Sequence, residues 1–213
     1  MTLTLVASAI AIAIFWGVRM RGAPESPVRA AIKTMPVALL ALAALGGGAP
    51  PWLAIALALG AAGDGLLAFD SRRGFFLAGV AAFLLSHLAY ARLFFAGADE
   101  AFSSGPVFLG ATLLLFVLTS GIYRRLLPDL GDMKLPVAAY CAAILAMAVA
   151  ALSRGLDPVL LPGVGLFMAS DTALAFGRFA KGIGEPLRAR LSAFVWYSYV
   201  AAQTLIAAAF LPA

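Results

Sequence analysis

The fold is decided by stretches such as residues 51–69, which read PWLAIALALGAAGDGLLAF. The stretch contains one charged side chain, Asp64, among apolar residues, glycines and a single proline. A helix of ~20 mostly apolar residues is long enough to cross the hydrocarbon core of a bilayer. Residues 51–69 therefore predict a membrane-spanning helix that carries one buried acid.

The composition of the whole chain agrees with this interpretation. The 213 residues are 63% hydrophobic and 12% charged, with a mean hydropathy of +1.01, whereas soluble domains are ~45–50% apolar and ~25% charged. So little polar surface excludes a soluble globule or a disordered chain, and the single Cys141 excludes a disulfide scaffold. The net charge of +5 does not indicate a nucleic-acid partner, because basic residues in membrane proteins mainly set topology.

Apolar runs separated by glycine, proline and charged residues predict eight membrane spans. They cover residues 2–18, 33–48, 51–69, 74–96, 106–123, 135–152, 158–177 and 190–211. The runs are apolar throughout and do not alternate with polar residues, which favours helices over a β-barrel. We therefore expect an all-α bundle of eight transmembrane helices, forming a single domain over residues 1–213.

The basic residues predict the orientation of this bundle. Thirteen of the fifteen lysines and arginines fall in the odd-numbered loops. They are Arg19, Arg21, Arg29, Lys33, Arg72, Arg73, Arg124, Arg125, Lys134, Arg178, Lys181, Arg188 and Arg190. Because cytoplasmic loops are enriched in basic residues, the odd-numbered loops are expected inside the cell and both termini outside.

The two halves of the chain resemble each other, about residues 1–97 and 105–213. GDGLLAF at 63–69 matches SDTALAF at 170–176, and KTMPVA at 33–38 matches KLPVA at 134–138. Such matches in the same order predict a parallel repeat of four plus four helices. Parallel repeats also occur in transporters.

Asp64 and Asp171 are the only acidic residues inside the eight spans, and the repeat places them at equivalent depths. Ionisable side chains within a membrane are costly and usually functional. We interpret them as two carboxyl groups that line one polar cavity. The alternative is that each acid pairs with a basic residue or caps a broken helix and serves folding alone.

Several other polar residues are candidates to contact a substrate. His87 and Tyr90 share one face of the fourth span, and Tyr199 and Gln203 share one face of the eighth. The remaining candidates are Lys33 at the start of the second span, Tyr140, Ser170 and Arg178. With one histidine and one cysteine in the chain, no metal site is expected.

Three motifs surround these residues. They are GDGLLAF at 63–69 followed by GVAAFLLSHLAY at 79–90, then GLFMASD at 165–171, and YSYVAAQTLI at 197–206. Together they resemble the YhhN family of eight-span membrane proteins over about residues 30–208. Residues 33–36 read KTMP and depart from the direct Lys-Pro pairing of that family, which affects the expected helix geometry there.

The resemblance implies lysoplasmalogenase activity. This activity cleaves the vinyl ether bond of a lysoplasmalogen, a lysophospholipid, and yields a fatty aldehyde and glycerophosphoethanolamine or glycerophosphocholine. The expected location is the inner (cytoplasmic) membrane of a bacterium, where the partners are the substrate and the surrounding membrane lipids. The oligomeric state is not indicated.

Two carboxyl groups suit this chemistry. Hydrolysis of a vinyl ether begins with protonation of the β-carbon and passes through an oxocarbenium ion, as in glycosidases, so one acid and one carboxylate suffice without a metal or redox cofactor. We expect one of Asp64 and Asp171 to donate the proton and the other to activate water. The hydroxyls of Ser170 and Thr172 favour Asp171 as the ionised member. The expected roles of the other residues are orientation of water and glycerol by His87, Tyr90, Tyr140 and Tyr199, and binding of the phosphate by Lys33 with Arg178.

Two other classes of protein also use paired intramembrane acids. A transporter or flippase for lipids or small amphiphiles would use the two aspartates as a proton relay. An intramembrane aspartyl protease carries a Gly-x-Gly-Asp motif, but residues 61–64 read AAGD, with alanine in place of the first glycine. The transporter is therefore the stronger alternative to a hydrolase.

Overall fold

The computed structural model describes residues 2–212, and every regular element in that range is a helix. Within it, eight helices are long and apolar enough to cross a membrane, which confirms the predicted helical membrane bundle. They are α1 (Thr2–Phe15), α2 (Pro27–Gly46), α3 (Pro51–Leu66), α4 (Arg73–Phe95), α6 (Pro106–Leu126), α7 (Lys134–Leu152), α8 (Leu160–Phe179) and α9 (Glu185–Phe210). The short turns η1 (Trp16–Met20), η2 (Leu67–Phe69), η3 (Leu127–Asp129) and η4 (Gly131–Met133) adjoin α1, α3, α6 and α7, and the short helix α5 (Glu100–Ser103) precedes α6.

Two predicted helix starts were wrong. The second helix begins at Pro27 and not at residue 33, and the eighth begins at Glu185 and not at residue 190. Ser26 caps α2 by accepting the backbone N–H of Arg29 at 3.1 Å, and Pro27 suits the first helical turn. Hydropathy detects only the apolar part of a helix, so these polar first turns were assigned to loops. Lys33 consequently lies inside α2 and does not open it.

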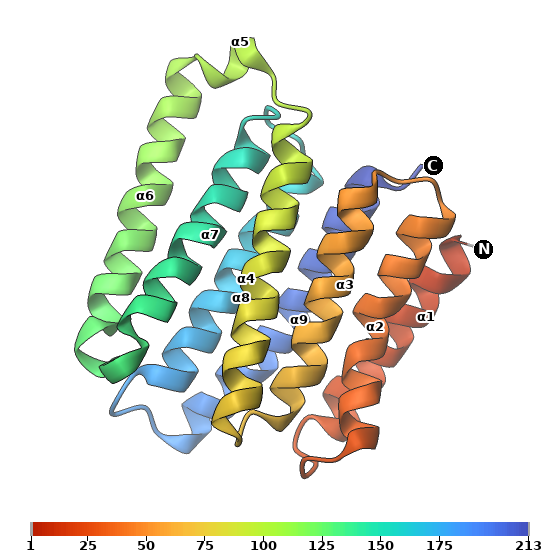
Figure 1. Ribbon diagram of the computed structural model, residues 1–213, viewed down its shortest axis with the longest axis vertical. Coiled ribbons are helices and arrows are strands. Elements are labelled where there is room, and N and C mark those ends of the chain that lie inside the picture. Colours follow the sequence, from red (N-terminus) through yellow and green to blue (C-terminus); the bar gives the residue numbers. More distant parts are fainter. Residues whose placement is uncertain (1, 213) are drawn as a thin grey trace.

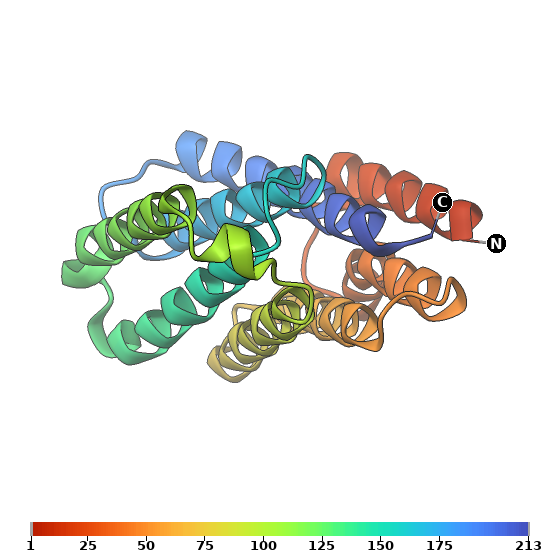
Figure 2. The ribbon, with the colours of Figure 1, turned by 90° about the horizontal axis from the view of Figure 1, so that it is seen from above.

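Within each half most neighbouring helices in sequence pack side by side, and α4 connects the two halves of the bundle through α7. α3 packs against α2 and α4, α8 packs against α9, and α4 contacts α7. α6 and α1 lie at opposite edges of the bundle (Figures 1 and 2). The two termini lie at the same end of the bundle (Figure 1); the side of the membrane on which they lie stays a prediction.

Glycines bring the central helices close together. A Cβ atom on Gly63 would lie 2.6 Å from the Phe83 ring, so α3 approaches α4 through a position that only glycine fits. A Cβ atom on Gly163 would lie 3.0 Å from the side chain of Ile206, where α8 meets α9. Small residues at helix contacts allow this close approach in membrane proteins. Because Asp64 follows Gly63, the contact with Phe83 also fixes the position of Asp64 against α4.

The second helix of each half packs differently. α2 lies mainly against α1 and α3, whereas α7 makes more contacts with α4 than with α8. The parallel repeat of residues 1–97 and 105–213 therefore stays a prediction.

Candidate active site

The two intramembrane acids line one cavity of about 330 Å³. Asp64 projects from α3 and Asp171 from α8, while residues of α2 and α9, including Lys33 and Tyr199, complete the walls. The fold thus brings together two carboxyl groups that are 107 positions apart in sequence (171 − 64). The cavity opens at the end of the bundle that carries most of its arginine side chains.

Asp64 is almost completely buried, with 3% of its surface exposed. Tyr199 on α9 donates a hydrogen bond to Oδ2 of Asp64 at 2.8 Å. Gly60, one turn earlier on α3, makes room for this tyrosine, because a Cβ atom there would lie 3.3 Å from the Tyr199 hydroxyl oxygen. Lys33 lines the same cavity without forming an ion pair with Asp64 within 4 Å. The contact of Asp64 in this cavity is therefore a single hydroxyl donor, Tyr199.

Asp171 has different neighbours, and 11% of its side chain is exposed. Tyr140 on α7 donates a hydrogen bond to Oδ2 of Asp171 at 2.9 Å. Nε2 of His87, on α4, lies 3.1 Å from the same oxygen. His87 itself is fully buried, and its ring packs against Tyr140 and Phe167 with centroid separations of 5.1 and 4.7 Å. This packing holds the imidazole edge toward the carboxyl group.

The contacts of His87 set the tautomer of its ring. Nδ1 lies 2.7 Å from the backbone carbonyl oxygen of Phe83; a carbonyl only accepts, so Nδ1 carries a hydrogen. Nε2 is directed toward the Asp171 side, although the contact lies off the hydrogen-bonding direction and Nε2 has no hydrogen-bond partner among residues 2–212. The 3.1 Å separation places an imidazole and a carboxyl group side by side, an arrangement that can hold and pass on a proton.

Tyr90 and Gln203 lie behind the cavity and not on its wall. Both are fully buried, and the Tyr90 hydroxyl donates to Oε1 of Gln203. The Gln203 amide nitrogen and the Tyr199 hydroxyl both lie beside Gly60, at 3.1 and 3.3 Å from the position of a Cβ atom there. Neither residue lines the cavity, so their contact with a substrate stays a prediction.

Ser170 lines the cavity, but its hydroxyl donates to the backbone carbonyl of Val195 at 3.0 Å. It is therefore directed toward α9 and not toward Asp171. Of the two flanking hydroxyls that favoured an ionised Asp171, this one makes no contact with the carboxyl group. The Ser170 hydroxyl therefore gives no reason to assign the ionised role to Asp171.

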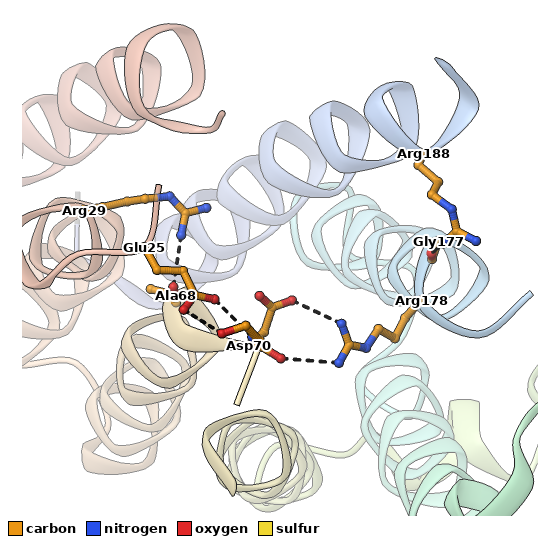
Figure 3. A network of polar contacts seen from close by, with 8 residues as sticks. Glu25, Arg29, Ala68, Asp70, Gly177, Arg178 and Arg188 are labelled. Atoms are coloured by element: carbon orange, nitrogen blue, oxygen red, sulfur yellow. Dashed lines mark hydrogen bonds and ion pairs between the residues drawn. The ribbon is translucent and has the colours of Figure 1, made fainter. Parts of the chain in front are cut away.

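A group of cationic side chains lines the same cavity. Its members are Arg21, Arg29, Lys33, Arg178 and Arg188. Arg29 donates to the carbonyl oxygen of Ala68 at 3.0 Å, and Arg188 donates to that of Gly177 (Figure 3). These carbonyls lie near the C-terminal ends of the third and seventh spans, where a positive charge is favourable. Arg29 and Arg188 thus stabilise helix ends while adding positive potential to the cavity.

Lys33 and Arg178 are the cations best placed to bind an anion. The Lys33 amine lies 5.9 Å from the Trp16 ring centroid, and it forms no ion pair within 4 Å in the described part of the chain. Arg178 lies over the Phe76 ring at 4.4 Å and is 3.6 Å from a carboxylate oxygen of Asp70 (Figure 3). Both residues were singled out from the sequence, and both line the cavity.

Three residues line the cavity without having been predicted to do so from the sequence, namely Trp16, Arg29 and Arg188. The arginines were counted only as determinants of topology, and Trp16 was included in an apolar span. A readable signal did exist for the arginines, because Ser26-Pro27 and Glu185-Pro186 are typical of helix starts. Extending each helix to these starts places Arg29 and Arg188 one turn inside α2 and α9.

The fold and the cavity together define a class, a polytopic membrane protein with a buried site built from two carboxyl groups and several cations. Within residues 2–212, no three His, Cys, Asp or Glu side chains gather as a metal-binding group. The chain belongs to the YhhN family, whose model matches residues 28–210.

Three relatives similar to this chain are named lysoplasmalogenase. The chain is 36% identical over 188 residues to a lysoplasmalogenase of Mycobacterium bovis, which covers 84% of this chain and 69% of the relative. It is 37% identical over 185 residues to human lysoplasmalogenase TMEM86B, covering 83% of this chain and 73% of that protein. A lysoplasmalogenase TMEM86B of Sus scrofa is 36% identical over 184 residues. No solved structure matches this chain.

Proposed function

We propose that this protein is a lysoplasmalogenase-like membrane hydrolase that cleaves the vinyl ether bond of a lysoplasmalogen. The observation that carries the proposal is that Asp64 and Asp171 line one cavity whose walls also hold several cations. Its relatives named lysoplasmalogenase match most of the chain, which supports the choice of reaction. The substrate is amphiphilic and anionic at its phosphate, and the cavity offers positive charge near its acids.

The reaction needs a proton at one carbon and water at the next. Protonation of the β-carbon of the vinyl ether turns the α-carbon into an oxocarbenium ion. Water adds to the α-carbon, and the resulting hemiacetal breaks into a fatty aldehyde and the glycerol hydroxyl of the head group. A positioned acid and a positioned base each accelerate such proton transfers by about 10²–10⁴.

Asp171 with His87 is the proton donor in this proposal. In the proposed resting state one proton lies on this pair, whose nearest side-chain atoms are 3.1 Å apart. Asp64 is the base, since it lies on the same cavity and receives one hydrogen bond from Tyr199. Asp64 takes a proton from the attacking water and returns it to the departing glycerol oxygen. The hemiacetal hydroxyl gives its proton back to the Asp171–His87 pair, so that both acids end as they began.

Lys33 and Arg178 bind the substrate phosphate. Lys33 has no ion-pair partner among residues 2–212, and Arg178 exchanges its contact with Asp70 for the phosphodiester, which also carries one negative charge. Arg29 and Arg188 contribute positive potential without leaving their helix ends. Tyr140 and Tyr199 hold the two acids in place, each through one hydrogen bond.

The test is aldehyde release from lysoplasmenylethanolamine by the purified protein in detergent. Wild type is expected to release aldehyde, and Asp64→Asn and Asp171→Asn are each expected to lose about 10²–10⁴ in kcat. The matched control is Glu100→Gln, the same carboxyl-to-amide change in α5, outside the eight spans. Near-wild-type turnover by either aspartate variant contradicts the two-acid mechanism.

The same measurement separates the hydrolase from the transporter alternative. Detergent micelles hold no gradient, so a transporter makes no product there, whereas a hydrolase turns over.

The protein is expected in the bacterial cytoplasmic membrane, with the cationic end of the cavity inside the cell. A periplasmic alkaline phosphatase fused to the C-terminus is then active, and an inactive phosphatase fusion reverses the proposed orientation.

A further inference from the structure

A second cavity lies directly beside the two-acid cavity. It has a volume of about 90 Å³ and is enclosed by α4, α6, α7 and α8. We call it the chain pocket, and the side chains that define it include Val80, Thr119, Ile122, Val137, Cys141 and Met168. Its walls are almost entirely apolar, in contrast to the cation-lined cavity next to it.

The two cavities share part of their walls. Phe76, Phe83, Asp171, Leu174 and Arg178 line both of them. Asp64 and Lys33, in contrast, line only the cation-lined cavity. The boundary between a polar and an apolar space therefore runs past Asp171.

We propose that the chain pocket binds the first part of the alkenyl chain of the substrate, an inference that rests on the proposed function. A lysoplasmalogen changes from a polar head group to a hydrocarbon chain at its vinyl ether bond. The space around Asp171 changes polarity in the same order. With the phosphate beside Lys33 and the chain in the pocket, the vinyl ether lies at Asp171.

This placement also orients the reacting atoms. The β-carbon, which takes the proton, is on the chain side of the ether oxygen, and Asp171 faces the chain side. The glycerol oxygen, which leaves, is on the head-group side, and Asp64 faces only that side. The two cavities thus present the donor and the base to the two ends of the bond that breaks.

α6 forms the outer wall of the chain pocket. Among its twenty-one residues only Thr119 and Leu126 are buried, and both line the pocket. Leu113, Val117 and Leu118 of the same helix are exposed, and α6 lies at the edge of the bundle (Figure 2). Thr119 is a small residue, and its hydroxyl has no hydrogen-bond partner in the described part of the chain. A larger side chain at position 119 would fill part of the pocket from the α6 side, whereas Asp171 lines it from the α8 side.

The first test measures occupancy without catalysis. Cys141 is the only cysteine and lines the pocket, so N-ethylmaleimide labelling of the full-length protein in phospholipid nanodiscs reports access to it. A saturated 1-alkyl lysophosphoethanolamine, which lacks the vinyl group, is expected to slow labelling about tenfold at roughly ten times its Kd. Glycerophosphoethanolamine has no chain and is expected to leave the rate unchanged. Equal labelling rates with and without the alkyl lipid overturn the proposal.

The second test measures chain selectivity. Thr119→Phe is expected to lower kcat/KM for a long-chain lysoplasmenylethanolamine about tenfold, the effect of removing roughly two methylene groups from the pocket. A substrate whose alkenyl chain is the two-carbon vinyl group alone places no carbon beyond Asp171, so it is expected to be affected less than about twofold. The control is Val117→Phe on the exposed face of the same helix, which leaves both substrates unchanged. Equal losses for long and short chains overturn the assignment of the pocket.

The two tests separate this inference from the proposed reaction. Loss of folding by Thr119→Phe is detected by size-exclusion chromatography, and the labelling test on wild type then still decides the question. If wild type releases no aldehyde, the proposed function fails, yet protection of Cys141 by the alkyl lipid still supports a hydrocarbon site. If aldehyde is released without that protection, the reaction stands and the chain pocket is wrong.

Discussion

Asp64 and Asp171 occupy matching positions in the two halves of the sequence, but their surroundings differ. Asp64 receives one hydrogen bond, from Tyr199, and lines only one of the two cavities, the cation-lined one. Asp171 meets both Tyr140 and His87 and lines both cavities. Two carboxyl groups that look equivalent in sequence are thus given different chemical partners by the helices that face them.

Each acid takes a partner from the last helix of the other half. Asp64 on α3 contacts Tyr199 on α9, and Asp171 on α8 contacts His87 on α4. At the offset of 111 that aligns Phe83 with Phe194, His87 corresponds to Ser198 and Tyr199 to Leu88. Under the predicted repeat, the aligned positions thus differ in the side chains that distinguish the two acids, as expected for a donor at one end of the cavity and a base at the other.

The largest expected effect comes from replacing each acid and then lowering the pH. Asp171→Asn is expected to lose about 10²–10⁴ in kcat at pH 7, because the proton donor is gone. Hydronium can replace that donor. After the rate without protein is subtracted, the residual rate of Asp171→Asn is therefore expected to rise about tenfold for each unit by which the pH falls. Asp64→Asn is expected to lose a similar factor at pH 7 without this rise, since its missing step is the activation of water.

The readout is aldehyde release between pH 7.5 and 5.5, with Glu100→Gln measured alongside as a control. If the acid-dependent rise appears in Asp64→Asn and not in Asp171→Asn, the roles of the two carboxyl groups are reversed. If it appears in neither variant, protonation of the β-carbon does not limit the reaction.

The next largest effect is expected at His87, which distinguishes the two ends of the cavity. His87→Asn places an amide nitrogen near the position of Nδ1, from which it can donate to the Phe83 carbonyl, but it carries no transferable proton. We expect kcat to fall about 10²-fold with little change in KM, since a general acid typically contributes at least that factor. A rise in KM with an unchanged kcat would instead make His87 a substrate contact, as expected from the sequence.

Ser86→Ala provides the matched control for His87. Ser86 is the neighbouring fully buried residue of α4, and its hydroxyl donates to the Ala56 carbonyl at 2.7 Å, away from both acids. Removing this hydrogen bond is expected to cost about 1 kcal/mol of stability and to leave kcat within about twofold. Steady-state kinetics and thermal melting of the two variants separate loss of a proton from loss of packing.

The sequence predicted the two acids and most of their immediate partners because polar residues are rare within these helices. Asp64, Asp171, His87, Tyr140 and Tyr199 stand out against apolar neighbours, and helical periodicity places His87 on a face that is buried. The eight spans were predictable for the same reason, since apolar runs of this length have few other uses.

What the sequence did not predict depends on the direction of single side chains and on the double use of charge. The Ser170 hydroxyl donates to the carbonyl of Val195, and Gln203 pairs with Tyr90; neither contact follows from spacing. Arg29 sets topology and also lines the cavity. A count of basic residues cannot separate these two uses, because both place the charge at the same end of a helix.

The smallest expected effect concerns an acid outside the spans, which shows what a purely structural carboxylate does. Glu25 is exposed and accepts hydrogen bonds from the backbone N–H of Ser71 at 3.0 Å and from its hydroxyl at 2.8 Å, linking two loops near the cavity (Figure 3). These hydrogen bonds hold the pKa of Glu25 below its ordinary value of 4.5. A lowered pKa stabilises the fold at pH values above the ordinary one, and this stabilisation is lost as the pH falls through the pKa of the folded state.

Glu25→Gln is therefore expected to melt about 2 °C or less below wild type at pH 7, as exposed contacts contribute little. The difference should shrink as the pH falls below about 4.5, while aldehyde release at pH 7 remains within twofold of wild type. Melting curves from pH 7 to 3.5, with Glu100→Gln as the exposed control, measure it. A difference in melting temperature that stays constant across this range would mean that the Glu25–Ser71 hydrogen bonds do not stabilise the fold. A large loss of activity would mean that acids outside the spans also take part in the reaction.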